Sequence, residues 1–275
     1  MVEIQHIDDC NDKRLQPFAR TLKRLKSEND MVGRGFVVEG VELVKRLLAS
    51  SLPYVAKIIL CVDSRVDSFV RENEKVLQKH RCEVLSCNSA IINKVGGYKF
   101  TRGVMAVGQL ACEMKLEDYA KSGVLLVCEH VENEENLGVM IRTAAALGME
   151  SVLLGEKGVS PHARRVIRVS MGNVFNVPVV RSGELIEDLK KLSTLGYEIV
   201  GAAVDDTAVS VHEYTQCKGR GVALVVGNEP CGLSESVLTL CDTKLMIPIE
   251  KATDSLNVSV AAGILMCALQ SKVSH

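Results

Sequence analysis

The chain of 275 residues contains no tryptophan and just five tyrosines and five phenylalanines, so extensive stacking of aromatic side chains is not expected. Positive and negative side chains almost cancel, leaving a net charge of −1, and global charge therefore gives no sign of a nucleic-acid partner. No apolar run approaches the length that spans a bilayer. The acidic N-terminal residues also differ from the basic and then apolar start of a secretory signal.

The ten cysteines form no Cys-x-x-Cys pair, and their closest spacing is that between Cys82 and Cys87. Scattered thiols of this kind are typical of a reducing, cytosol-like compartment, so we expect a cytoplasmic protein without a disulfide framework or a zinc site. The six histidines are dispersed as well. The sequence therefore predicts no metal centre.

Two nucleotide-binding signatures are missing. Gly227 and Gly232 follow an apolar run with the spacing of a phosphate-binding loop, but Leu233 occupies the position of the required lysine. Without that charge the terminal phosphates have no partner, which argues against an NTPase. No Gly-x-Gly-x-x-Gly follows an expected strand either, so the usual dinucleotide fingerprint is absent. For residues 227–234 a purely structural turn remains an alternative to a binding loop.

Hydrophobic periodicity predicts alternating strands and helices along the whole chain, and hence an α/β fold. In the first part we expect strands at 36–40, 55–61, 82–85 and 103–110, with helices at 41–49, 66–79 and 89–95. A charged linker follows. Beyond it we expect strands at 124–131, 151–155, 198–204, 222–227 and 244–249, with helices at 137–147, 163–170, 184–195, 235–240 and 256–269. Such alternation indicates a mostly parallel sheet covered on both faces.

Three segments carry the most specific information. The first, 133–149, contains Asn136, Gly138 and Arg142 as Asn-x-Gly-x-x-x-Arg. In the second, the apolar residues 222–226 run into Gly227-Asn-Glu229-Pro-Cys-Gly232. The third reads Ile247-Pro248, then Ser255-Leu-Asn-Val-Ser259. Helix capping explains Asp254 or Ser255 at a helix start, but not Asn257, a poor helix former expected just inside that helix. A polar amide there suggests a binding site.

In order and spacing, these segments resemble the three signature motifs of the SpoU (TrmH-like) branch of the SPOUT RNA methyltransferases. The resemblance implies a C-terminal α/β domain with a trefoil knot at 123–275, which pairs with a second copy to form a homodimer. Residues 11–15 and 35–40 resemble, more loosely, the L30e-like substrate-binding domain found ahead of many SpoU enzymes. We therefore expect an L30e-like domain at 1–112 and a linker at 113–122.

The resemblance also implies a function, the S-adenosyl-L-methionine-dependent 2′-O-methylation of structured RNA, ribosomal RNA rather than transfer RNA. The cofactor would lie against Gly227, Ile247 and Leu256, held largely by backbone groups. Ser255 and Asn257 would orient nucleotide and cofactor. No metal takes part.

Arg142 is the expected catalytic residue, with Asn136 and Glu229 fixing its geometry. Taken alone, Arg142 would be interpreted as a helix-face arginine that covers apolar surface or pairs with Glu135. Its guanidinium keeps its proton in proteins, so we expect it to stabilise the developing alkoxide. Water, a substrate phosphate or a transiently neutral Arg142 could accept the proton, and the sequence does not choose among them.

Local clusters of basic residues would be solvated helix faces on spacing alone, but the resemblance favours RNA contact for them. These are Arg20, Lys23, Arg24, Lys26 and Arg34 near the N-terminus, and Arg164, Arg165 and Arg168 further on.

The chain departs from the family pattern at Asn133 and Glu134, where Asp-Pro is common, and at Pro230, where glycine is common. These departures keep one alternative open, a non-catalytic RNA-binding or ribosome-assembly factor on the same fold. A third hypothesis, a small-molecule methyltransferase on an ordinary Rossmann sheet, lacks the glycine-rich first turn.

Overall fold

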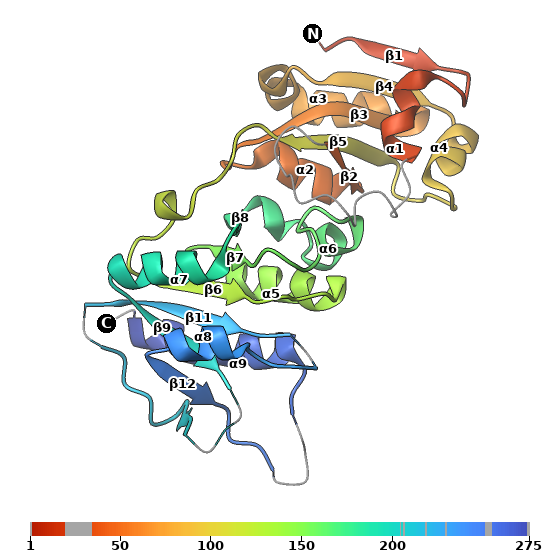
Figure 1. Cartoon of the computed structure of the whole chain (residues 1–275). Helices are drawn as coiled ribbons and strands as arrows, with labels where there is room; N and C mark the ends of the chain where they lie inside the picture. Colours follow the sequence, from red (N-terminus) through yellow and green to blue (C-terminus); the bar gives the residue numbers. More distant parts are fainter. Residues whose placement is uncertain are drawn as a thin grey trace. The chain divides into compact units, whose positions relative to one another are not determined.

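The computed structural model describes residues 2–19, 35–203, 205, 207–217, 219–228, 230–250 and 255–273. The chain forms two compact units, each with its own sheet (Figure 1). Unit 1 comprises Met1–Glu113 and His162–Asn176, and unit 2 comprises Met114–Pro161 and Val177–His275. The expected boundary near residue 112 is close to the first of these divisions. The stretch His162–Asn176, which lies inside the expected domain 123–275, has its contacts with unit 1.

Unit 1 is built on a five-stranded sheet in the order β1-β4-β3-β5-β2. Strands β1, β4 and β3 are parallel, whereas β5 runs antiparallel to both β3 and β2. Its strands are β1 (Ile4–Ile7), β2 (Gly35–Glu39), β3 (Tyr54–Val62), β4 (Glu83–Cys87) and β5 (Val104–Leu110). Its helices are α1 (Gln16–Ala19), α2 (Val41–Ala49), α3 (Asp63–His80), α4 (Ser89–Gly96) and α6 (Arg164–Val169).

The helices of unit 1 cover the sheet with one apolar face each. In α2 the buried residues recur at helical spacing, at Leu43, Val44, Leu47 and Leu48. On α4, Asn88 caps the first turn by accepting a hydrogen bond from the Ile91 amide. Every strand and helix predicted in this part of the chain is present, with ends shifted by no more than three residues.

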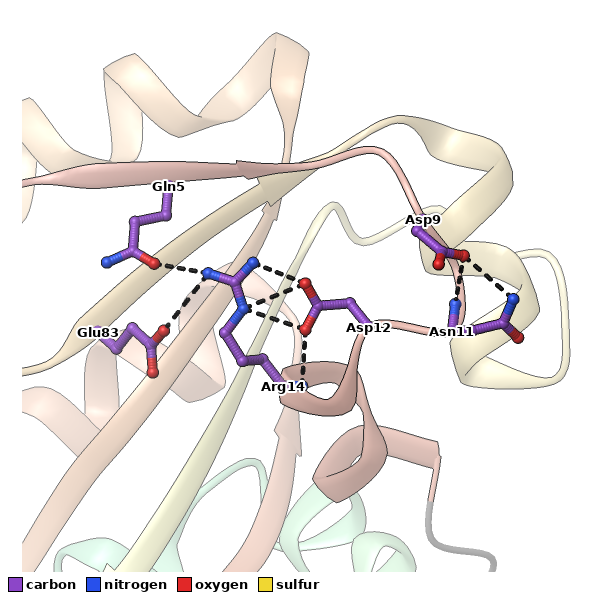
Figure 2. A network of polar contacts seen from close by, with 6 residues as sticks. All are labelled: Gln5, Asp9, Asn11, Asp12, Arg14 and Glu83. Carbon is purple, nitrogen blue, oxygen red and sulfur yellow. Dashed lines mark hydrogen bonds and ion pairs between the residues drawn. The ribbon is translucent and has the colours of Figure 1, made fainter.

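A polar network holds the edge strand β1, which the sequence did not predict (Figure 2). The Arg14 guanidinium donates to the Asp12 carboxylate at 2.6 Å and to the Gln5 amide oxygen at 2.6 Å. Asp12 also accepts from the Arg14 backbone amide and so caps a short 3₁₀ turn. The hydrogen bond from Arg14 lowers the pKa of Asp12 to about 2. The network therefore connects β1 to the start of the first helical segment.

The stretch 162–176 is attached to the rest of unit 1 by an aromatic cluster. The His162 ring stacks on Phe36 with centroids 4.6 Å apart, and Tyr54 and His162 are hydrogen-bonded at 3.0 Å. Phe175 packs against the rings of both Phe36 and Tyr54. Since all four side chains are almost fully buried, α6 is part of the unit 1 core rather than an appendage.

Unit 2 has a seven-stranded, entirely parallel sheet in the order β10-β12-β9-β11-β6-β7-β8. Its strands are β6 (Val124–Cys128), β7 (Val152–Leu154), β8 (Val179–Arg181), β9 (Tyr197–Ala202), β10 (Val209–Ser210), β11 (Gly221–Val226) and β12 (Thr243–Met246). Its helices are α5 (Glu134–Ala146), α7 (Leu185–Thr194), α8 (Glu235–Leu240) and α9 (Val258–Val273). Every residue of the central strands β6 and β11 is buried, which explains their continuous apolar sequences. The expected α/β class with a parallel sheet is confirmed.

Two strands of unit 2 were not predicted, β8 and β10, because strands of three and two residues carry too little periodicity. Helix α9 begins at Val258, not at the expected Leu256. None of the helices in the described part of the chain combines the length and apolar content needed to cross a bilayer.

Candidate functional site

The carboxyl ends of β9, β11 and β12 and the start of α9 surround a cavity of about 620 Å³ in unit 2. This is the edge of a parallel sheet at which ligands usually bind. All five predicted residues from the second and third motifs that the structure describes line this cavity: Gly227, Ile247, Ser255, Leu256 and Asn257. The sequence therefore placed these residues around one site without knowing the sheet order.

Gly227 ends β11 at a point where the following loop folds back. The Asn228 amide donates to the Gly232 carbonyl at 3.1 Å, and the Gly232 amide donates to the Asn228 carbonyl at 2.9 Å. A Cβ atom at Gly227 would overlap the backbone of Gly232. The loop itself therefore requires glycine at position 227. Gly232 has a positive φ of 67°, which glycine adopts without strain. We had expected Gly227 to serve ligand approach.

Asn228 is a cavity residue that the sequence argument missed. Its side-chain amide donates to the His130 carbonyl at 2.9 Å, which ties the loop after β11 to the loop after β6. His130 itself has a positive φ of 52°, unusual for a non-glycine residue. The Asn228 Oδ1 atom is buried and has no hydrogen-bond partner among the described residues. A buried amide oxygen without a partner is uncommon in folded proteins, which marks Asn228 as an unusual residue of the cavity wall.

Asn257 and Asn136 form a direct amide pair, Asn257 Nδ2 donating to Asn136 Oδ1 at 3.1 Å. We expected Asn257 just inside α9. In the structure it precedes the helix and caps it. Its Oδ1 accepts from the Ser259 amide at 2.9 Å and from the Ser259 hydroxyl at 2.7 Å. Helix capping therefore does explain Asn257. Its side-chain nitrogen, which donates to Asn136, connects the third motif to the first.

The departures Asn133 and Glu134 have a local explanation. Asn133 caps α5, and its side chain accepts hydrogen bonds from the Glu135 and Asn136 amides. Aspartate, which is common here in the family, caps a helix N-terminus in the same way as asparagine. Glu134 occupies the first helical position, where a carboxylate interacts favourably with the helix dipole. Both changes therefore preserve the helix start that presents Asn136.

Arg142 lies on the exposed side of α5 and is not part of the cavity wall. Among the described residues it makes no hydrogen bond and no ion pair. It shares this side of α5 with Val139, which is 38% exposed. Asn136, in contrast, is 8% exposed and turned toward α9. The structure thus brings Asn136 to Asn257 but leaves Arg142 open to solvent.

The three arginines near α6 differ in their surroundings. Arg164 is engaged within unit 1, donating to Glu39 Oε1 at 2.9 Å and to the Phe18 carbonyl at 2.5 Å. Its side chain is 16% exposed, so it is not available as a surface contact. Arg165 is half-buried and Arg168 is exposed. The other predicted positions, Arg20, Lys23, Arg24, Lys26, Arg34 and Glu229, lie outside the described residues.

One acidic side chain in the cavity wall is held in its charged form. Asp205 accepts hydrogen bonds from the Thr207 hydroxyl and amide and from Lys244 Nζ, the last at 3.1 Å. The bond from the Thr207 hydroxyl and then that from Lys244 lower the pKa of Asp205 to about 2. The cavity therefore combines apolar walls with one permanent carboxylate and several amides.

Comparison with known proteins gives matches over nearly the whole chain. The family model described as SpoU rRNA Methylase family matches residues 123–267. An uncharacterized tRNA/rRNA methyltransferase of Mycobacterium bovis is 30% identical over 96% of this chain and 90% of its own length. A 23S rRNA guanosine 2′-O-methyltransferase of Bacillus subtilis is 33% identical over 86% of this chain and 88% of its own. The AdoMet-bound rRNA methyltransferase from Sinorhizobium meliloti superposes with a TM-score of 0.82 at 21% identity, over 98% of both chains.

Proposed function

Since the chain belongs to the SpoU rRNA Methylase family, as its three motifs predicted, we propose that it transfers a methyl group from S-adenosylmethionine to a ribose 2′-hydroxyl of structured RNA. Ribosomal RNA is the proposed substrate class, because a relative that matches most of the chain is named for methylation of 23S rRNA. A cytoplasmic location, where such RNA is found, is part of this proposal.

The observation that carries the proposal is the convergence of the second and third motifs on one cavity of about 620 Å³. The residues fit the cofactor. Apolar walls at Ile247 and Leu256 suit an adenine ring, and the side-chain amides of Asn228 and Asn257 give the same cavity polar groups. When bound, S-adenosylmethionine supplies an electrophilic methyl group on a sulfonium centre. Ser255, at the mouth of the same cavity, would orient the nucleotide beside it.

The amide pair Asn136–Asn257 would hold the edge between cofactor cavity and RNA in a fixed geometry. Each amide is anchored at a helix start, Asn257 as the cap of α9 and Asn136 within the first turn of α5. Positioning of this kind lowers the barrier because the reacting groups lose their motional freedom on binding. Glu229 completes the set of positioning residues in this proposal.

Arg142 would act on the 2′-hydroxyl as a fixed cation. The guanidinium stays protonated at neutral pH and so stabilises the negative charge that develops on the attacking oxygen. Its free donors are consistent with this role, because no contact with the described residues occupies them. Water or a substrate phosphate would accept the proton.

A homodimer through the knotted domain is proposed from the exposed apolar surface of unit 2. Helices α5 and α9 pack side by side and run in the same direction, since Asn136 contacts Asn257 and Gly263 lies against Thr143. Val139, Val260 and Ile264 are 38%, 51% and 41% exposed on these two helices. A second copy that covers this face would also cover Arg142, and would bring it near the partner's RNA. The trefoil knot is part of the same proposal.

For RNA contact, the exposed Arg168 replaces Arg164 as the leading candidate on α6, because Arg164 already pairs with Glu39, and Arg165 stays a proposed contact. Arg20, Lys23, Arg24, Lys26 and Arg34 stay proposed contacts. Phosphate contacts of this kind position RNA without reading its sequence.

Calorimetric titration with S-adenosylmethionine tests the proposal first. We expect saturable binding at about one site per chain. Leu256→Asp, which puts a charge into the cavity wall, should abolish that binding, whereas the surface variant Lys75→Ala should not change it. Mapping of 2′-O-methyl groups in ribosomal RNA from cells that lack the gene then identifies the nucleotide. A folded, cofactor-free protein that does not bind would instead favour the RNA-binding factor without catalysis.

A further inference from the structure

One aromatic side chain of unit 1 stands apart from the other nine in the protein. All ten tyrosines and phenylalanines lie in the described part of the chain, and Tyr98 is the one that is exposed, at 48%. It belongs to the loop of residues 97–103, between α4 and β5, with the sequence Gly-Tyr-Lys-Phe-Thr-Arg-Gly. A protein poor in aromatics thus places one ring on its surface between glycines.

The loop is fixed to unit 1 although its tip is exposed. Phe100 inserts into the core with 5% exposure, and its backbone amide donates to Asn93 Oδ1 at 2.6 Å. Gly97 and Gly103 have φ values of 73° and 75°, which glycine adopts without strain. Tyr98 and Lys99 are therefore held outward by the anchored residue that follows them.

The Tyr98 ring is held in place through its hydroxyl, which donates to Glu39 Oε2 at 2.7 Å. Partial desolvation of the side chain and then the Glu39 bond raise the pKa of Tyr98 to about 12. Glu39 in turn pairs with Arg164 at 2.9 Å. Because Arg164 neutralises Glu39, this carboxylate does not cancel the charge of other cations nearby.

Three further cations belong to the same surface: Lys99, Arg102 and Arg65 are all exposed. Arg102 donates to the Glu39 carbonyl at 3.3 Å, and none of the three forms an ion pair with a described residue. The stems of Arg65 and Arg102 lie over glycine backbone. A Cβ at Gly103 would be 2.5 Å from Arg65 Cδ, and one at Gly40 would be 3.1 Å from Arg102 Cδ. Arg65 and Arg102 therefore lie against the same loop region as Tyr98, and Arg102 and Tyr98 both contact Glu39.

We propose that this surface, formed by Tyr98, Lys99, Arg102 and Arg65, binds an unpaired segment of RNA, with a base stacked on Tyr98 and phosphates beside the cations. The inference rests on the proposed function for the choice of RNA. Single-stranded RNA is bound by exposed aromatic rings next to basic side chains. A protein partner would require a wider apolar surface, and apart from Tyr98 the one large exposed apolar residue of unit 1 in the described ranges is Met171.

Binding of two labelled RNAs tests the proposal, a hairpin with a wide unpaired loop and a fully paired duplex of equal length. Tyr98→Ala should weaken hairpin binding roughly ten-fold and leave duplex binding unchanged, because stacking requires an unpaired base. Tyr98→Phe should retain most of the affinity, since the ring remains. The double variant Lys99→Ala/Arg102→Ala should lower the salt slope for the hairpin by about 1.4, and Lys75→Ala/Lys79→Ala on α3 should lower it less.

The absence of tryptophan allows a direct readout of stacking. In Tyr98→Trp the indole is the sole tryptophan, and its fluorescence should be quenched by the hairpin and not by the duplex. Leu195→Trp, at a position 45% exposed in unit 2, is the matched control and should not respond.

Equal quenching in both variants, or hairpin affinity that Tyr98→Ala leaves unchanged, would overturn the proposal. Because these readouts need neither cofactor nor methyl transfer, they can succeed even if the proposed enzymatic function fails, and the reverse holds as well.

Discussion

At the scale of single residues, the site depends on asparagine side chains that connect segments far apart in the sequence. Asn257 caps α9 with its oxygen and contacts Asn136 with its nitrogen. Asn228 donates to the His130 carbonyl, while its own oxygen is buried without a hydrogen-bond partner among the described residues. An amide carries a donor and an acceptor on one rigid plane, which a carboxylate or a hydroxyl does not offer in the same arrangement.

Asn228 gives the first prediction. Asn228→Ala removes the bond to the His130 carbonyl that holds this part of the cavity wall, and we expect roughly ten-fold weaker binding of S-adenosylmethionine in calorimetry. Asn228→Asp keeps an acceptor but loses the donor, so it should weaken binding as well. Thr239→Ala on α8 is the control, and equal effects at both positions would contradict a specific role for Asn228.

Arg142 gives the second prediction. Arg142→Ala should lower kcat for methyl transfer by about 10²- to 10³-fold, the usual effect of losing one group that stabilises developing charge. The dissociation constant of S-adenosylmethionine should change little, because Arg142 is not in the cavity wall. Arg142→Lys should restore part of the rate. Weaker cofactor binding with unchanged turnover at saturation would exclude this role.

Asp205 gives a prediction of pH dependence. Its folded-state pKa of about 2 lies below the usual value of about 3.9. A lowered pKa contributes stability that is present above about pH 4 and is lost as the pH falls toward about 2. The difference in free energy of unfolding between wild type and Asp205→Asn should therefore be constant from about pH 5 to 7 and shrink toward about pH 3. A difference that grows on acidification would contradict the cited hydrogen bonds.

At the scale of elements, the segment 162–176 shows how secondary structure can be predicted while its packing is not. Helix α6 is present as predicted, yet it belongs to unit 1 through the cluster of His162, Phe36, Tyr54 and Phe175. Apolar side chains at helical spacing indicate that a helix is buried on one face. They do not indicate which sheet it packs against.

The ion pair of this segment can be tested for its contribution to stability. Both partners are largely buried, at 16% and 12% exposure for Arg164 and Glu39. Arg164→Met leaves the Glu39 carboxylate without its cation, and we expect unit 1 to lose roughly 3 kcal/mol in urea unfolding. The double variant Arg164→Met/Glu39→Gln should recover part of this loss. Arg168→Met, on the same helix but exposed, should cost far less.

At the scale of the whole molecule, the apolar face of α5 and α9 predicts association. Ile264→Arg should convert a dimer into a monomer in sedimentation or light scattering, because it places a charge in the centre of that face. The exposed Leu195→Arg, at the end of α7, should leave the association state unchanged. A wild-type monomer at micromolar concentration would contradict the proposed dimer and the position of Arg142 within it.

The sequence by itself determined the α/β class, nearly all of the longer elements and the family, because these follow from local periodicity and from residues close together in the chain. It also identified Gly227, Ile247 and Leu256 as cavity residues. Short strands such as β10 were not predicted, because two residues are too few to show a hydrophobic period. The tertiary structure alone decided that Asn257 is hydrogen-bonded to Asn136 and that Arg164 forms an ion pair with Glu39. It also decided that Asn228 Oδ1 is buried without a partner among the described residues. Such contacts join residues up to 125 positions apart, and their free energy depends on burial and geometry that only the folded chain creates.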